Sequence, residues 1–156
     1  LKITEYDIIG FSDGGITALL LGMKDERLKH IVTIGANTKP NMLKLIYRLG
    51  MVVELICLVP FCIYNKKARR TLKLTQLMLT QPHIEYADLN KITVPTLVLA
   101  GEFDMIKRED TEAIANSIQY SIMKIIEQGN HCLLSDSFEK TLEEITRFLQ
   151  ACHQED

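Results

Sequence analysis

A glycine-rich turn near the start of the chain constrains its fold more than any other feature. The turn, Gly10-Phe11-Ser12-Asp13-Gly14, follows the short apolar run 6–9. After the turn, apolar residues recur at the spacing of one helix face, at Ile16, Leu19, Leu20 and Met23. A buried strand, a tight turn and an amphipathic helix in this order are typical of a parallel β–α unit. The sequence therefore predicts that Ser12 lies where a strand ends and a helix begins.

The alternation of strands and helices continues to the end of the chain. Three further strands are predicted over His30–Ile34, Val94–Ala100 and Ile122–Ile126. A helix is predicted over 109–118, and a last helix follows Asp136-x-x-Glu139, which resembles a capping box. The inner face of that last helix is expected to carry Phe138, Leu142, Ile145 and Leu149. This order favours an α/β fold, a parallel sheet with helices on both faces.

Residues 38–90 interrupt this alternation, and we interpret them as a small helical cap inserted into a single domain of residues 1–156. One helix is expected to begin at Pro40 and to break at Gly50, and another covers Lys66–Gln81, with Leu74, Leu77 and Met78 on its inner side. The stretch Met51–Ile63 is apolar on every side. It is expected to be buried, either as ordinary core or as the wall of an acyl or aromatic pocket.

Composition narrows the class of protein. The chain has 47% hydrophobic and 24% charged residues and a net charge of −2, which gives no electrostatic case for a nucleic-acid partner. The longest apolar run contains Glu54 and Pro60, so we expect no membrane-spanning segment and no membrane partner. The basic run Lys66–Arg70 is interpreted as a solvated helix face rather than a docking patch. Four cysteines without disulfide or zinc spacing are expected to be reduced thiols of a cytoplasmic protein.

Ser12 is the candidate nucleophile. It lies at the centre of a G-x-S-x-G motif whose strand–turn–helix setting is that of a nucleophile elbow. In such a turn the serine is strained, and Gly10 and Gly14 are expected to let neighbouring backbone pass without a Cβ clash. The free N–H groups at the helix N-terminus favour developing negative charge, so the N–H of Asp13 is the candidate oxyanion donor.

A serine hydroxyl needs a base and an acid that orients the base. His131 follows the fourth predicted strand, and Asp104 follows the third, so both are expected at the edge of the sheet where Ser12 lies. Glu102 is the nearest alternative acid, and Asp110 is a poorer one because it begins a helix. The other three histidines are expected away from this edge, at His30, at His83 in the cap and at His153 in the terminal tail.

Three segments together resemble the α/β-hydrolase family, and in particular small esterases of the kind that includes valacyclovir hydrolase. The segments are Ile8–Leu19, Val94–Ile106 and Gly129–His131. The order Ser12, Asp104, His131 is also that of the family's catalytic residues. The resemblance implies acyl transfer from a small-molecule ester to water through a serine acyl-enzyme. It implies no metal and no organic cofactor.

The chain departs from the family pattern at its start. The family's first four strands are absent, and with them the loop that supplies the second oxyanion donor, whose loss typically costs ~10²–10³ in rate. We therefore expect the chain to be the C-terminal portion of a longer hydrolase. The strand near Tyr6 then becomes an open sheet edge, through which two copies of the chain, or this chain and another, could pair.

Other functions remain open at this stage. One alternative is a non-catalytic interaction module derived from a hydrolase, which needs a partner or upstream sequence. Another keeps the fold but changes the bond, as in carbon–carbon cleavage or perhydrolysis. Haloalkane dehalogenation is disfavoured because that chemistry uses a carboxylate at the elbow, where this chain has Ser12.

Overall fold

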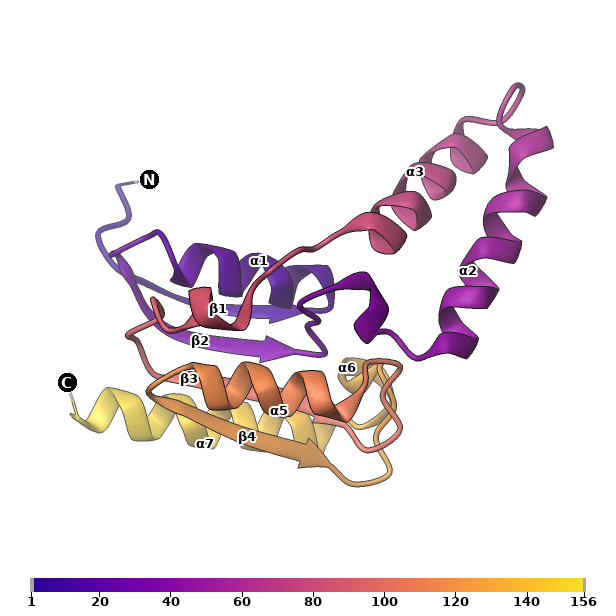
Figure 1. Ribbon diagram of the computed structural model, residues 1–156. Coiled ribbons are helices and arrows are strands. Elements are labelled where there is room, and N and C mark those ends of the chain that lie inside the picture. Colours follow the sequence, from indigo (N-terminus) through magenta and orange to yellow (C-terminus); the bar gives the residue numbers. More distant parts are fainter. Residues whose placement is uncertain (1, 156) are drawn as a thin grey trace.

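Four parallel strands form the centre of the protein in the computed structural model, which describes residues 2–155 (Figure 1). The strands are β1 (Tyr6–Phe11), β2 (Leu28–Ile34), β3 (Thr96–Gly101) and β4 (Ser121–Ile126). They pair in the order β1-β2-β3-β4, and every pair is parallel. The four predicted strands are thus confirmed, each with small shifts at its ends.

Helices cover both faces of this sheet. On one face, α1 (Asp13–Gly22), α4 (Tyr86–Leu89) and α5 (Arg108–Ser117) enclose a core that includes Leu19, Ile31 and Ile114. On the other face, α6 (Leu133–Asp136) and α7 (Phe138–Glu155) enclose a second core that includes Val32, Leu97 and Phe148. Because β3 is buried on both faces, its sequence is a continuous apolar run, as parallel strands require. The predicted α/β class is confirmed.

β1 lies at the edge of the sheet, as predicted. In the described part of the chain it pairs with β2 alone, and the side chain of Ile9 is 52% exposed. An open apolar edge of this kind can accept a further strand.

Two long helices project away from the sheet between β2 and β3 (Figure 1). After the short 3₁₀ helix η1 (Pro40–Met42) the chain forms α2 (Leu45–Leu58), the 3₁₀ turn η2 (Val59–Phe61) and α3 (Lys66–Thr80). The Thr75 hydroxyl donates to the Glu54 carboxylate at 3.0 Å and joins the two helices. The structure thus places helices in the region 38–90, and its role as a cap stays a prediction.

The predicted break at Gly50 is wrong, because α2 runs through it without interruption. A glycine in a helix interior costs only about 1 kcal/mol relative to alanine, which the surrounding leucine, methionine and glutamate residues can offset. α3 agrees with the predicted helix over 66–81.

The burial expected for Met51–Ile63 is also wrong. Most of these side chains are exposed, and Ile63 is 72% exposed. Leu74 and Leu77, expected on the inner side of α3, are about half exposed as well. The reason is that α2 and α3 pack mainly on each other, and a pair of helices can bury only one narrow stripe of each.

The predicted capping box before the last helix is absent. Asp136 ends α6, and its carboxylate accepts hydrogen bonds from Asn130 and Ser135. α7 begins at Phe138, whose side chain is exposed, as is that of Leu142. Ile145 is buried and Leu149 packs against the same core, as predicted, and Phe148 is buried beside them.

No helix in the described residues is both long enough and apolar enough to cross a lipid bilayer. All four cysteines have free thiols.

Candidate active site

Ser12 lies at the sharp turn between β1 and α1. Its backbone angles are φ 54° and ψ −117°, a strained conformation for a residue other than glycine. Two backbone hydrogen bonds hold it, from Ser12 N–H to the Ile34 carbonyl (2.8 Å) and from Ile16 N–H to the Ser12 carbonyl (3.1 Å). The turn therefore has the strained geometry that the sequence predicts for a nucleophile elbow.

Gly10 and Gly15 make this turn sterically feasible, whereas the sequence predicted this role for Gly10 and Gly14. A Cβ on Gly10 would clash with the Gly14 carbonyl, as expected. A Cβ on Gly14 would meet nothing within 4 Å, so the steric role predicted for Gly14 is wrong. Gly15 has that role instead, because its Cβ would lie 2.7 Å from Thr33 Oγ1 on β2. Gly15 lets α1 pack closely on the sheet.

The three residues that the sequence predicted as nucleophile, base and acid meet at the carboxyl edge of the sheet. His131 Nε2 lies 3.1 Å from Ser12 Oγ, and His131 Nδ1 lies 2.8 Å from Asp104 Oδ1. Ser12 follows β1, Asp104 follows β3, and His131 follows β4. A continuous line of hydrogen bonds thus joins a hydroxyl, an imidazole and a carboxylate.

Asp104 is held firmly in this line. Its side chain is 3% exposed, and it accepts backbone hydrogen bonds from Ile106 N–H (3.0 Å) and Gly101 N–H (3.4 Å). Burial raises the pKa of Asp104, but the hydrogen bond to His131 and the two backbone N–H groups outweigh it and lower the pKa below its usual value. Asp104 is therefore an anion at neutral pH, and it orients the imidazole.

Two neighbours of His131 were not predicted from the sequence. Gly35, at the end of β2, has φ 61°, and a Cβ there would lie 2.9 Å from His131 Cε1. The ring of Phe11 lies beside the imidazole, with 5.2 Å between ring centroids. A signal for Gly35 existed, because it ends a strand at the same sheet edge as Ser12.

The loop that carries His131 is fixed against the loop that carries Asp104. The N–H of Phe103 donates to the Gly129 carbonyl at 2.8 Å, and the N–H of Gln128 donates to the Glu102 carboxylate at 2.9 Å. Glu102, the nearest alternative acid, is thus engaged with the backbone of this loop instead of the imidazole of His131.

Asp110, the other alternative acid, belongs to a buried network away from His131. Its carboxylate accepts from Thr38 N–H (2.9 Å), Thr38 Oγ1 (2.6 Å) and Tyr86 OH (2.7 Å). These bonds connect α5 to both ends of the 38–90 region.

The remaining histidines lie elsewhere. His83 is exposed in the segment before α4. His153 belongs to α7, so its placement in a terminal tail was wrong.

His153 lies with His30 beside Asp7, whose carboxylate bonds to His30 Nδ1 (2.7 Å) and His153 Nε2 (3.0 Å). These three residues, whose ligand atoms lie within 4.8 Å of one another, are the set with metal-binding potential in the described residues. Their mutual hydrogen bonds give them a structural role at the start of β1, away from Ser12.

Asp13 begins α1, so its N–H has no acceptor within the helix. Thr17 Oγ1 donates to the Asp13 carbonyl at 2.8 Å and fixes this first turn. The assignment of the Asp13 N–H as an oxyanion donor stays a prediction.

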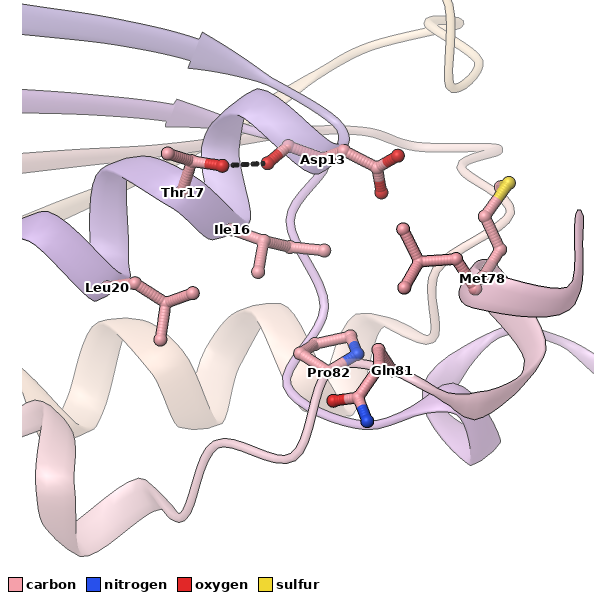
Figure 2. Close-up of a pocket in the computed structure, with 8 residues that line it drawn as sticks. Asp13, Ile16, Thr17, Leu20, Met78, Gln81 and Pro82 are labelled. Carbon is pink, nitrogen blue, oxygen red and sulfur yellow. Dashed lines mark hydrogen bonds between the residues drawn. The ribbon is translucent and has the colours of Figure 1, made fainter. Parts of the chain in front are cut away.

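Two cavities lie beside the first turn of α1, and one of them is lined by Ser12. A small one of about 10 Å³ is lined by Ser12, His131 and neighbouring residues that include Asn37, Leu43 and Met105. A second, mostly apolar cavity of about 210 Å³ lies between α1 and the end of α3. Figure 2 shows Asp13 and Ile16 facing Met78 and Pro82 across it.

The two cavities are neighbours, since Asp13, Met78 and Gln81 line both. Among the described residues, none from the stretch 51–63 lines either cavity, so the pocket wall expected there is formed by α1 and α3 instead. A larger cavity of about 530 Å³, beside β4 and α7, contacts neither Ser12 nor His131.

No protein-family model matches the chain, and no curated protein matches it. Solved structures do match. A serine hydrolase involved in carbazole degradation, CarC, has a TM-score of 0.69 and 20% identity over 94% of this chain and 64% of its own. A lipase-esterase related protein from Clostridium acetobutylicum has a TM-score of 0.71 and 19% identity over 93% of this chain and 66% of its own.

MenH from S. aureus is similar to the same degree, with a TM-score of 0.70 and 19% identity over 96% of this chain and 69% of its own. The chain therefore spans about two thirds of the length of the structures that it matches. Nearly all of it follows their course, and the arrangement of its sheet and helices is theirs. The chain has the α/β-hydrolase fold.

Proposed function

We propose that the chain is a serine hydrolase that cleaves carboxylic esters, or related acyl bonds, of a small molecule. One observation carries the proposal: hydrogen bonds of 3.1 and 2.8 Å join Ser12 Oγ to the imidazole of His131 and that imidazole to Asp104. The strained backbone of Ser12 at the start of α1 supports the same role.

In the proposed reaction, Ser12 Oγ attacks the carbonyl carbon while its proton moves to Nε2 of His131. The buried carboxylate of Asp104 holds the proton on Nδ1 and stabilises the imidazolium that forms. The Asp13 N–H donates to the oxyanion of the tetrahedral intermediate. His131 then gives its proton to the departing alkoxide, which leaves an acyl-enzyme on Ser12. Water repeats the sequence, loses a proton to His131 and releases the acid.

The cavity that Ser12 lines and the apolar cavity next to it support a short acyl group. The apolar cavity of about 210 Å³ is smaller than the roughly 300–1,000 Å³ that drug-sized ligands occupy. Its walls include Leu20, Leu77 and Met78, which suit an alkyl chain.

The four free thiols support a cytoplasmic location.

A fluorophosphonate probe tests the proposal, because it reacts only with an activated serine. We expect the purified chain to be labelled and the Ser12→Ala variant not to be labelled. Ser135→Ala is a matched control: this serine is exposed in α6 and its hydroxyl bonds only to Cys132 and Asp136 beside it, so its loss should leave labelling unchanged.

The outcomes separate the proposal from its alternatives. Labelling that survives in Ser12→Ala rules out Ser12 as the nucleophile. A folded chain that is never labelled favours the non-catalytic interaction module. If labelling depends on Ser12, a panel of p-nitrophenyl esters with increasing acyl length follows, and we expect the highest kcat/KM for the shortest chains. Carbon–carbon cleavage, or peracid formation from an acyl group and hydrogen peroxide, without ester hydrolysis would change the bond assigned.

A further inference from the structure

The point where α2 turns into α3 exposes a group of apolar side chains. We call residues 59–64 the hairpin tip; its exposed large hydrophobic side chains are Val59, Phe61, Ile63 and Tyr64. Tyr64 is 91% exposed, so almost none of its ring is covered by protein. The tip lies far from the sheet and from both ends of the chain (Figure 1). These side chains contribute little to the core, and the fold alone gives no reason for them to be apolar.

Basic residues follow the tip directly. Five of them are exposed along α3, at Lys66, Lys67, Arg69, Arg70 and Lys73. The segment 55–81 contains no acidic residue, although the whole chain has a net charge of −2. Within residues 2–155, none of the five forms an ion pair with another residue. The surface of α3 next to the hairpin tip therefore carries a concentrated positive charge that no ion pair neutralises.

Exposed apolar side chains bordered by free basic groups match the surface of an anionic bilayer. Apolar and aromatic residues enter the boundary between headgroups and acyl chains, while lysine and arginine reach the phosphates. The cytoplasmic leaflet is negatively charged and attracts such basic segments. An acidic protein surface would satisfy the basic residues but would leave side chains as exposed as Ile63 and Tyr64 without a matching environment.

We propose that the hairpin tip and the five basic residues of α3 bind the surface of an anionic membrane without crossing it. The sequence led us to expect no membrane partner because no segment could span a bilayer. Binding at the surface needs no spanning segment, and the exposure of the tip became visible only in the structure. The same binding gives the basic run 66–70 a role as a docking patch, against its interpretation as a plain solvated face.

Co-sedimentation with vesicles tests this proposal independently of any catalytic activity. We expect the chain to bind phosphatidylcholine vesicles that contain phosphatidylserine, and to bind vesicles of phosphatidylcholine alone much more weakly. Binding should weaken as salt is added, because the phosphate contacts are solvent-exposed. The Ser12→Ala variant should bind as well as the unaltered chain.

Two pairs of variants separate the apolar and basic contributions. Phe61→Ser with Ile63→Ser should abolish binding, and Lys66→Gln with Lys67→Gln should weaken it about 25-fold, at about fivefold per charge. All four positions are exposed, so these changes should leave the fold intact, which circular dichroism checks.

Matched controls lie on other elements. Phe138→Ser removes an equally exposed aromatic ring, and Lys24→Gln with Lys140→Gln removes the same charge. Each should leave vesicle binding within about twofold. Equal losses in the controls, equal binding to neutral vesicles or no binding at all would overturn the proposal. A concentration-dependent dimer that dissociates in Phe61→Ser, without vesicle binding, would assign the surface to a second copy of the chain and overturn it too.

Discussion

At the scale of single residues, the candidate site depends on the absence of a side chain at Gly35 as well as on the polar groups that are present. The imidazole of His131 fits against the Cα of Gly35 on one side and the ring of Phe11 on another. Neither contact makes a hydrogen bond, yet both limit where Nε2 can point relative to Ser12 Oγ. The alignment of the three polar groups therefore rests on apolar and glycine neighbours.

Gly35→Ala is expected to disturb this alignment. The new Cβ would lie 2.9 Å from His131 Cε1, and φ 61° is unfavourable for alanine. We expect fluorophosphonate labelling to slow about 100-fold, since a misplacement of about 1 Å costs that much, and the free energy of unfolding to fall by about 1–2 kcal/mol. Labelling kinetics and urea unfolding measure the two effects.

Gly50→Ala is the matched control for this change. A Cβ at Gly50 meets nothing within 4 Å, and the residue lies inside α2. Alanine there should raise the free energy of unfolding by up to about 1 kcal/mol and leave labelling unchanged. Unchanged labelling in Gly35→Ala as well would show that the imidazole tolerates the new methyl group and that Gly35 has no positioning role.

At the scale of secondary structure elements, one carboxylate connects the 38–90 region to the rest of the fold. Asp110 at the start of α5 accepts two hydrogen bonds from Thr38, where this region begins, and one from Tyr86, near its end. Asp110 is completely buried. The two ends of the helical insertion are thus held together beside the sheet while α2 and α3 extend away from it.

Asp110→Ala should destabilise the protein strongly. Three donors would lose their acceptor in a buried place, and each unsatisfied buried donor costs about 1–3 kcal/mol. We expect the free energy of unfolding to fall by about 3 kcal/mol or more, measured by urea denaturation. Asp88→Ala is the comparison, because Asp88 is partly exposed and pairs with the exposed Lys91; it should cost below about 1 kcal/mol. Similar losses in the two variants would mean that the buried network adds nothing beyond a surface ion pair.

At the scale of the whole molecule, Asp7 connects the edge of the sheet to the last helix. Its carboxylate bonds to His30 on β2 and to His153 on α7. Burial raises the pKa of Asp7, but the hydrogen bonds and charges of the two histidines outweigh it and lower the pKa below its usual 3.8. The ionised carboxylate therefore binds its neighbours better than the protonated acid does.

This shift predicts how stability varies with pH. A carboxyl group whose pKa is lowered by folding stabilises the protein fully above its unfolded pKa and loses that effect as the pH falls through the folded value. The unaltered chain should exceed Asp7→Asn in free energy of unfolding above pH 3.8, and the difference should shrink as the pH falls below this value. Urea titrations across this range provide the measurement. A difference that stays constant down to the most acidic conditions would show that ionisation of Asp7 contributes nothing.

The sequence was most informative where local pattern and position agree. Ser12, Asp104 and His131 each follow a strand, and parallel strands bring their carboxyl ends to one edge, so their meeting was predictable without coordinates. The four strands were predictable from their short apolar runs, and in β2 and β3 these runs reflect burial on both faces of the sheet.

The rest depended on which surface each helix meets. Met51–Ile63 is apolar but exposed, because hydrophobic residues indicate burial only when a partner surface exists. The sequence pattern does not distinguish Gly14 from Gly15, yet only Gly15 lies close to β2. The roles of Gly35 and Asp110 depend on contacts between distant segments, which no local pattern encodes.

The distance along the chain between Ser12 and His131 also affects how the protein must fold. The two residues are 119 positions apart, and they meet only when all four parallel strands are paired in register. A fold with so many non-local contacts has a high contact order, and the entropy of closing its long loops must be lost before the contacts form, which slows folding. Helices α1, α3 and α7 can form early from local interactions, whereas Ser12 and His131 can meet only once the strands that carry them have paired. We therefore expect a growing or refolding chain to gain helical content before the hydrogen bond between Ser12 and His131 forms.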